Sequence, residues 1–258
     1  MEAISLGARL ASDGASARVF RRLLLARRGL QDAGATDPVQ MRLRALQGRA
    51  IWLRPLAADV QTVIDVFVDC EHLPPPLPHP PKAVLDLGAN IGLTIAHFAT
   101  LYPRAMVLGV ELDADNAALC RENVKQWGQR CTVVEAGVWV HDGVVPYVRH
   151  ERREVSHAIA RRVSADTRMA SAISLASAVA RIASRGGAVD YMKMDIEGAE
   201  QDVLEQGAAW ANRVRAIRVE VHSPYTTKQC ATDLERLGFR THVEHRRRSY
   251  VVGRRNGA

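Results

Sequence analysis

The sequence predicts an α/β protein with a mostly parallel sheet, an antiparallel C-terminal hairpin and an N-terminal helical extension. From residue 83 onward, short apolar segments alternate with segments of helix length, which is the pattern of βαβ units and therefore of parallel strands. The C-terminal end differs, because two strand-like segments, 238–244 and 249–253, are separated only by a short basic turn. We expect these two segments to form a hairpin at one edge of the sheet.

The individual elements follow from the apolar runs. We expect strands at 84–87, 106–110, 131–134, 191–194 and 216–221, and helices at 91–101 and 115–127. An insertion between residues 142 and 190 interrupts this alternation. Within it we expect a strand at 144–149 paired with 157–161, followed by a helix over the alanine-rich segment 171–184.

We divide the chain into three segments. Residues 1–48 are an N-terminal helical extension, residues 49–81 hold a strand at 50–55, a helix at 59–72 and a proline-rich connector, and residues 82–258 form the main domain. The segment 17–28 is predicted as a helix with an apolar stripe and an arginine-rich face. We expect this helix to cover the domain; the alternatives are a peripheral contact with a membrane and a homodimer contact.

The composition limits the possible partners and the location of the protein. The formal net charge of +7 favours an anionic partner, but no nucleic-acid-binding motif accompanies the charge, so we expect a solvated basic surface and no nucleic-acid partner. The cysteines are widely spaced without a Cys-x-x-Cys pair, which argues against a zinc site or a disulfide framework. Reduced thiols, the lack of a secretory signal and the lack of a long apolar run predict a cytoplasmic protein without a transmembrane span.

The turn that follows the first strand of the main domain carries the clearest chemical signal. Its sequence is Asp86-Leu87-Gly88-Ala89-Asn90-Ile91-Gly92. The context of strand, glycine-bearing turn and helix is the one that a nucleotide-binding loop requires, but the glycine spacing is not that of dinucleotide-binding proteins and the Lys-Ser/Thr of a P-loop is missing. The carboxylate of Asp86 suits a cationic amino group and the helix N-terminus suits a carboxylate, so the loop favours a zwitterionic ligand.

A second acidic residue strengthens this interpretation. Glu111 lies 25 residues after Asp86, at the end of the second predicted strand. A carboxylate at that position accepts hydrogen bonds from both hydroxyls of a ribose. The glycine loop and Glu111 together predict a cofactor of nucleoside type.

Residues 51–252 resemble the FkbM family of methyltransferases. Besides the glycine loop and Glu111, the matching segments are Leu53-Arg54-Pro55 with Asp59, then Asn123, then Lys193-Met194-Asp195-Ile196-Glu197-Gly198-Ala199-Glu200, and finally Val219-Glu220-Val221-His222. The resemblance implies a Rossmann-like class I methyltransferase fold with a seven-stranded sheet, and S-adenosyl-L-methionine as the methyl donor. It also implies O-methylation, typically of a hydroxyl on a sugar, glycolipid or secondary metabolite.

The resemblance further implies which residues hold the cofactor. Those that would hold its methionine part and ribose are Asp86, Gly88, Asn90, Gly92 and Glu111. Those that would flank the adenine are Leu112, Glu135 and Ala136. The segment 136–143 is bulkier than the small polar residue and acid that the family often has after the third strand, so the chain departs from the family's pattern there.

Polar residues follow the fourth and fifth strands of the predicted sheet. Ligands of such folds bind outside the carboxyl ends of the strands, so Asp195, Glu220 and His222 should face one crevice. A hydroxyl is a poor nucleophile and needs a base or a metal to remove its proton. His222 is our candidate base, with His141 as the second candidate, and either histidine has a structural role as its alternative. Asp195 and Glu220 also offer oxygen ligands to Mg²⁺, and we expect Glu200 to serve the following helix.

The insertion is expected to form a lid over the acceptor. Its arginine runs, at 149–153 and 161–162, are candidates for contact with an anionic acceptor, and a solvated loop is the alternative. We expect the acceptor to be a small molecule, glycan or glycolipid. Two other functions stay open: an RNA methyltransferase, suggested by the basic charge, and a non-catalytic scaffold subunit that binds the cofactor.

Overall fold

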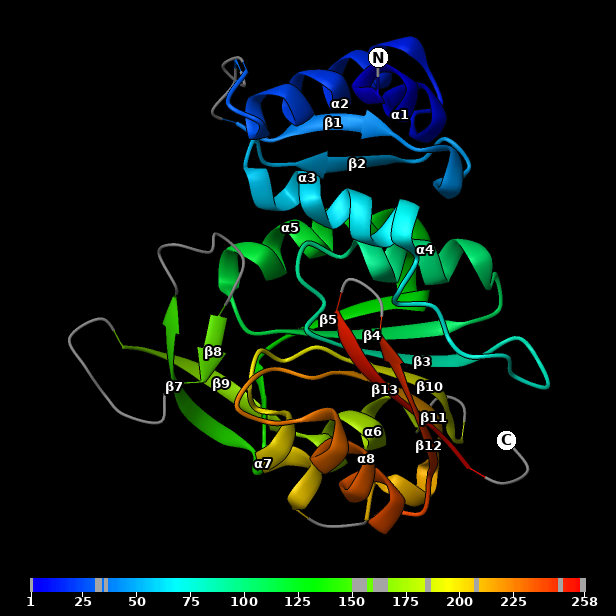
Figure 1. The fold of residues 1–258 in the computed structure, drawn as a ribbon, viewed down its shortest axis with the longest axis vertical. Helices are drawn as coiled ribbons and strands as arrows, with labels where there is room; N and C mark the ends of the chain where they lie inside the picture. Colours follow the sequence, from blue (N-terminus) through cyan, green and yellow to red (C-terminus); the bar gives the residue numbers. More distant parts are fainter. Residues whose placement is uncertain are drawn as a thin grey trace.

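The structure, a computed structural model, describes residues 2–30, 34, 37–149, 157–159, 167–183, 187–206, 209–245 and 248–255. Within this part of the chain the main sheet has seven strands in the order β12-β13-β11-β10-β3-β4-β5 (Figure 1). Their bounds are β3 Ala83–Leu87, β4 Met106–Glu111, β5 Cys131–Glu135, β10 Val189–Met194, β11 Val214–Glu220, β12 Arg240–His245 and β13 Ser249–Arg254. The strands from β11 to β5 are parallel, and β13 runs antiparallel to both β11 and β12. The predicted fold class and the edge hairpin are thereby confirmed.

Helices cover both faces of this sheet. On one face lie α4 (Leu93–Leu101) and α5 (Ala114–Val124), and on the other lie α6 (Leu175–Ala183), α7 (Glu200–Glu205) and α8 (Thr227–Arg236) (Figure 1). Successive strand residues point to opposite faces, so Val84 packs with α4 while Leu85 packs with α6 and α8 in a second core. Because both faces are buried, the inner strands are mostly apolar, and the few charged side chains on them, such as Asp86 and Lys193, are paired.

The N-terminal residues form a unit above α4 and α5 (Figure 1). It consists of α1 (Glu2–Leu10), α2 (Gly14–Arg27), the antiparallel pair β1 (Val39–Arg42) and β2 (Ala50–Leu53), and α3 (Ala57–Ile64) with a π-helical turn at Asp65–Asp69. Phe20, Leu23 and Leu24 of α2 are buried in the same core as α4, as a covering helix requires. Strand β1 was not predicted, because a four-residue segment with one buried side chain carries no clear period. The helix predicted at 59–72 ends earlier, since Cys70 adopts a left-handed conformation with φ 53°.

Two polar contacts fasten this unit to the main domain. Asn123 of α5 donates to the carbonyl oxygens of Ile91 and Trp52, at 2.8 and 3.1 Å, and accepts from the amide of Trp52 at 2.6 Å. Arg54 pairs with the fully buried Asp59 at 2.8 Å. A second bond of Arg54, to Asn116 Oδ1 at 2.8 Å, continues the network to α5.

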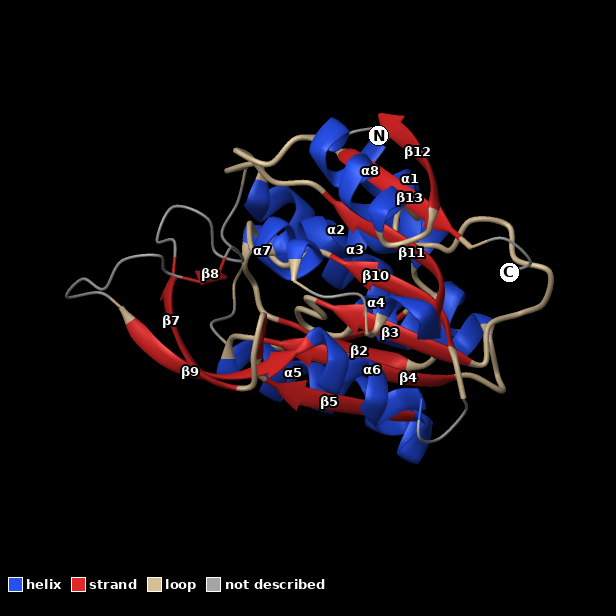
Figure 2. Cartoon of the chain, turned by 90° about the horizontal axis from the view of Figure 1, so that it is seen from below, coloured by secondary structure: helices blue, strands red, loops and turns tan. Residues whose placement is uncertain are grey.

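The insertion forms a second sheet, which projects beyond one side of the main sheet (Figure 2). Its order is β6-β9-β7-β8, with β6 Gly137–Trp139, β7 Gly143–Arg149, β8 His157–Ile159 and β9 Arg168–Ser174. The expected pairing of β7 with β8 is confirmed. The helix predicted over 171–184 is wrong in its first part, because residues up to Ser174 belong to β9 and α6 begins at Leu175. Pairing of β9 with strands on both sides overrides the helical preference of its alanines.

Short 3₁₀ segments and loops complete the chain. The 3₁₀ segments are Arg44–Leu46, Lys125–Arg130 and Ala211–Arg213. The proline-rich connector, residues 74–81, contains no helix or strand, as expected. Among the described residues, no helix combines the length and the apolar character that crossing a bilayer requires.

Replacing Asn123 by Ala should lower the free energy of unfolding by about 2–4 kcal/mol, because it leaves buried backbone groups of Trp52 and Ile91 without partners. Urea denaturation followed by circular dichroism measures the change. Lys125→Ala, two residues further on and exposed, is the matched control and should stay within about 0.5 kcal/mol of the wild type. Equal stabilities of the two variants would contradict the anchoring role of Asn123.

Candidate active site

Two adjoining cavities lie at the carboxyl ends of the parallel strands. The first, here called the β4 cleft, has a volume of about 540 Å³. Its lining includes Gly88, Asn90, Glu111, Leu112, Asn116, Ala136, Val138, Ile159, Asp195 and Glu197. The second, here called the β10 cavity, has a volume of about 840 Å³. Its lining includes Gln61, Asp65, His72, Leu93, Thr94, Lys193, Glu220 and Arg248. Both cavities are lined by Gly88, Asn90, Asp195 and Glu197, so a ligand that passes these residues can occupy both.

The glycine loop between β3 and α4 is held by its own amides. Those of Gly88 and Ala89 donate to Val110 O at 2.9 and 3.0 Å. The amide of Asn90 donates to Glu111 Oε2 at 2.8 Å. The next two amides donate to Asn90 Oδ1 and Ala89 O, at 2.8 and 2.9 Å respectively. The loop is therefore locked onto β4, and its amides are engaged before any ligand arrives.

The two glycines of the loop are required by packing inside the protein. Gly88 has φ 80°, and a Cβ atom there would lie 1.8 Å from the carbonyl oxygen of Asp195. Gly92, with φ 84°, would bring a Cβ atom to 2.7 Å from the sulfur of Cys120. Any other residue at Gly88 would displace the backbone of Asp195, and at Gly92 it would require Cys120 to shift. The close approach at Gly88 is to the β10–α7 loop.

Glu111 stands at the end of β4 with its carboxylate in the β4 cleft. It accepts the amides of Asn90 and Asp113 at 2.8 and 2.9 Å. Burial raises the pKa of Glu111 to about 7, although the two amides act in the opposite direction. The Asn116 side chain also donates to this carboxylate, whose remaining lone pairs can accept from a ligand.

The predicted cofactor residues are distributed unevenly around the cavities. Leu112 and Ala136 line the β4 cleft with Glu111. Gly92 and Glu135 do not belong to the described lining of either cavity. Glu135 is exposed and pairs with Arg121 at 3.0 Å, and its contact with adenine stays a prediction.

A buried lysine joins the glycine loop to the fourth strand of the parallel sheet. Lys193 Nζ lies 3.3 Å from Asp86 Oδ1 and 3.4 Å from Asp195 Oδ2, and donates to Gly88 O at 3.0 Å. Burial alone would lower the pKa of Lys193, but the neighbouring carboxylates more than offset it and hold that pKa above its usual value. Asp86, fully buried, also accepts the hydroxyl of Thr94. Sequence reasoning gave Lys193 no role; a lysine within an apolar strand was the available signal, because such a charge must be paired.

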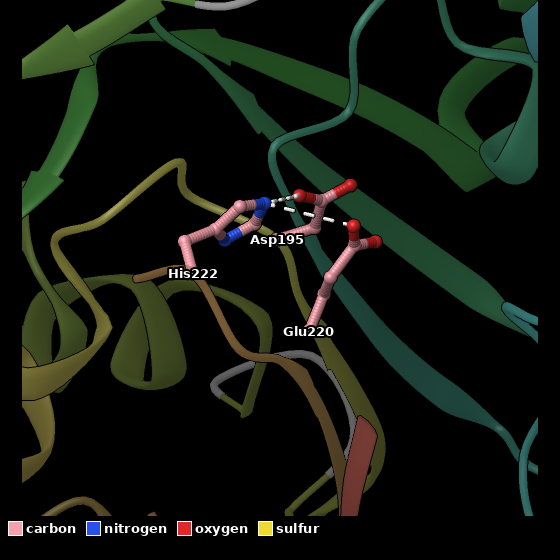
Figure 3. A group of neighbouring side chains, drawn as sticks. All are labelled: Asp195, Glu220 and His222. Atoms are coloured by element: carbon pink, nitrogen blue, oxygen red, sulfur yellow. Dashed lines mark ion pairs between the residues drawn. The ribbon is translucent and has the colours of Figure 1, made fainter. Parts of the chain in front are cut away.

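Asp195, Glu220 and His222 converge, as predicted, at the ends of β10 and β11 (Figure 3). His222 Nε2 lies 3.7 Å from Asp195 Oδ1 and 3.6 Å from Glu220 Oε1. Ligand atoms of the three side chains lie within 4.8 Å of one another. Burial acts to raise the pKa of Asp195, but Lys193, His222 and Arg248 outweigh it and lower that pKa.

His222 is oriented by Glu200, the first residue of α7. Its Nδ1 lies 2.8 Å from Glu200 Oε1, while Nε2 faces the other carboxylates. Burial acts to lower the pKa of His222, but the hydrogen bond to Glu200 and the charges of Asp195, Glu200 and Glu197 raise it to about 9. Glu200 also accepts the amides of Ile196 and Gly198 in the preceding turn, so it serves both the turn and the histidine.

Glu220 is bound by Arg248, which also contacts the N-terminal unit. Arg248 donates to Glu220 Oε2 and to Asp65 Oδ2, both at 3.1 Å, and so bridges the C-terminal hairpin to the turn after α3. The hydroxyl of Tyr250 lies 3.3 Å from the same Glu220 oxygen. Burial, together with the charge of Asp195, raises the pKa of Glu220 to about 7 in spite of Arg248.

His141, the second candidate base, lies apart from this cluster. It is exposed, and it lines a separate pocket with Trp139 and Trp210. The β8 residue Ile159 and the β6 residue Val138 bring the insertion to the wall of the β4 cleft. The arginine runs at 149–153 and 161–162 lie outside the described residues, apart from the backbone of Arg149.

Comparisons with known proteins assign the chain to a family. Residues 86–249, more than half of the chain, match the family model for the methyltransferase FkbM domain. No curated protein matches the chain in sequence.

Solved structures share the fold at low identity. Precorrin-6y C5,15-methyltransferase from Geobacter metallireducens is 13% identical, with a TM-score of 0.41 over 68% of this chain and 80% of that one. An O-methyltransferase family protein from Burkholderia thailandensis is 14% identical, with a TM-score of 0.47 over 78% and 60%. Aeropyrum pernix fibrillarin, solved with natively bound S-adenosyl-L-methionine, is 14% identical, with a TM-score of 0.42 over 67% and 66%. At these identities the likenesses carry no information about the acceptor.

Replacing Lys193 by Met should destabilise the protein by about 3–5 kcal/mol, because the carboxylates of Asp86 and Asp195 would stay buried without their cation. Chemical denaturation measures this change. Lys228→Met, at an exposed position on α8, is the control and should change stability by less than about 0.5 kcal/mol. A Lys193→Met protein as stable as the control would show that the three charges do not depend on one another.

Proposed function

Because the chain belongs to the FkbM methyltransferase family, we propose that it transfers the methyl group of S-adenosylmethionine to a hydroxyl of a sugar, glycolipid or secondary metabolite. S-adenosylmethionine is the methyl donor of this enzyme, and the choice of a hydroxyl acceptor rests on one observation. His222 is held at Nδ1 by Glu200 and presents Nε2 to the crevice beside Asp195. A histidine fixed in this way suits the removal of a proton from a hydroxyl.

The β4 cleft fits the nucleoside half of the cofactor. Leu112, Val138 and Ile159 provide apolar walls for a flat base, and the Glu111 carboxylate retains lone pairs for the ribose hydroxyls. The methionine part then passes Gly88 and Asn90 into the β10 cavity, since both cavities share these residues.

We assign different roles to the other predicted residues. Ala136 lies against the adenosine half. Asp86 acts through Lys193, and Gly92 acts by shaping the start of α4. The bound cofactor supplies a methyl group activated on a sulfonium.

The side chains at the strand ends prepare the acceptor. The acceptor oxygen forms a bond to the methyl carbon as the carbon–sulfur bond breaks, and the hydroxyl proton passes to His222 Nε2. Asp195 and Glu220, both within 3.7 Å of that nitrogen, stabilise the imidazolium. The raised pKa of His222 means that the neutral, proton-accepting form is the minor one at pH 7.

Substituting Gln for Glu111 should weaken S-adenosylhomocysteine binding by about 10-fold or more, because an acceptor for the ribose is lost and the loop contact with Asn90 is disturbed. Isothermal titration calorimetry gives the dissociation constants. Glu235→Gln, at an exposed position on α8 outside the described lining of both cavities, is the control and should bind as the wild type does. No binding by the wild-type protein would refute the cofactor assignment.

The acceptor has to be found before turnover can be measured. Methyl transfer from radiolabelled S-adenosylmethionine to a panel of free sugars and glycolipids serves this purpose. Failure of the whole panel, with cofactor binding intact, would speak for an acceptor of the secondary-metabolite class.

With the acceptor in hand, kcat/KM should rise between pH 7 and 9 and level off above about pH 9, as His222 loses its proton. His222→Gln should remove this rise and lower kcat/KM by about 10²- to 10⁴-fold. His242→Gln, exposed and paired with Glu244, is the control and should keep the wild-type profile. A rise that persists in His222→Gln would assign the base to another group.

Mg²⁺ is the alternative means of activating the hydroxyl, since Asp195 and Glu220 offer oxygens close to His222 Nε2. Lys193 and Arg248, however, already neutralise these carboxylates, and a divalent ion would meet both cations. We therefore expect activity to survive EDTA and to gain nothing from added Mg²⁺. Loss of activity in EDTA and its recovery with Mg²⁺ would favour metal-assisted deprotonation instead.

A further inference from the structure

The methionine part of the cofactor carries an α-carboxylate that needs hydrogen-bond donors. The amides of residues 88–92 cannot supply them, because each already donates within the protein. The first residues of α4, Leu93 and Thr94, lie at a helix N-terminus and line the β10 cavity. Their amides have no acceptor within the helix, and the helix dipole favours an anion there.

A buried histidine lines the same cavity. His72 follows the turn after α3 and is 5% exposed. Its Nε2 lies 3.0 Å from Nδ1 of His97, on α4. Its Nδ1 is buried and has no partner among the described residues. A buried polar atom without a partner is costly, so a ligand that reaches the cavity gains by binding it.

The surroundings of His72 keep its ring neutral. Burial, His97, Lys193 and Arg218 hold the pKa of His72 well below its usual value, so the ring is neutral. The same two cations are each paired with a carboxylate, Lys193 with Asp86 and Arg218 with Glu244, so a hydrogen-bond donor for a ligand has to come from His72 itself. If His97 Nδ1 donates to His72 Nε2, the proton of the His72 ring lies on Nδ1 and is available to the ligand.

We propose that His72 donates from Nδ1 to the α-carboxylate of the cofactor's methionine part, together with the first-turn amides of α4. His97 positions His72 and sets its tautomer. His72 precedes the segment 86–249 that matches the family, so the N-terminal part of this chain contributes directly to cofactor binding. The inference rests on the proposed function, because it takes S-adenosylmethionine as the ligand.

Two substitutions of His72 distinguish the roles of its two ring nitrogens. His72→Asn retains a donor near the position of Nδ1, whereas His72→Gln places its polar group near that of Nε2 and leaves the Nδ1 position empty. Calorimetry with S-adenosylhomocysteine should show wild-type-like affinity for His72→Asn and roughly 10- to 100-fold weaker binding for His72→Gln. Circular dichroism and thermal unfolding of both variants check that each is folded.

Modified ligands identify the group that His72 binds. Decarboxylated S-adenosylhomocysteine keeps the amine and lacks the carboxylate, so wild type and His72→Gln should bind it equally. The assignment is wrong if His72→Gln binds the decarboxylated ligand more weakly than the wild type does. It is also wrong if His72→Gln binds S-adenosylhomocysteine with wild-type affinity. If the wild type and His72→Gln instead bind a deaminated analogue with equal affinity, Nδ1 accepts a hydrogen bond from the amine, and the carboxylate assignment is wrong. Absence of S-adenosylhomocysteine binding in the wild type would count against the proposed function itself.

Discussion

The ammonium of Lys193, set between the carboxylates of Asp86 and Asp195, is the contact on which the rest of the site depends. It joins neighbouring strands, since Asp86 lies on β3 and Lys193 on β10, and its bond to Gly88 O fixes the glycine loop as well. Asp86 is fully buried and the other two side chains are largely buried, so loss of the Lys193 ammonium would leave the Asp86 carboxylate without its cation. The positions of the glycine loop and of Asp195 are therefore set together.

The balance of charge around Asp195 follows from the same contact. Acidic groups gather where β10 and β11 end, and Lys193, Arg248 and His222 supply the compensating cations. A protonated His222 at neutral pH is part of this balance. In the proposed mechanism, removal of the acceptor's proton depends on the fraction of neutral imidazole. The ring would then compensate charge at rest and accept a proton during transfer.

The sheet and the positions of its acidic residues could be predicted from the sequence, because strand ends are marked by local apolar runs. Asp195, Glu220 and His222 were found in this way, and the structure brings them together. Contacts between distant segments could not be predicted. Strand β9 depends on partners on both sides, and Glu200 meets His222 only after α7 and β11 have packed. His72 could not be singled out from the sequence, because the feature that distinguishes it is a buried ring nitrogen without a partner, and no sequence pattern indicates such an atom.

The role of the glycine loop differs from the one that its sequence predicts. Its glycines allow close packing against Asp195 and Cys120, and its amides bind β4, so the loop shapes the site more than it donates to a ligand. In the proposed binding mode, donors for the methionine part come from the first turn of α4 and from the cavity wall that α3 and the turn after it build. Asn123 and the pair Arg54–Asp59 fasten that wall to α5. A shift of the N-terminal unit would thus change the cofactor site without altering any residue of the glycine loop.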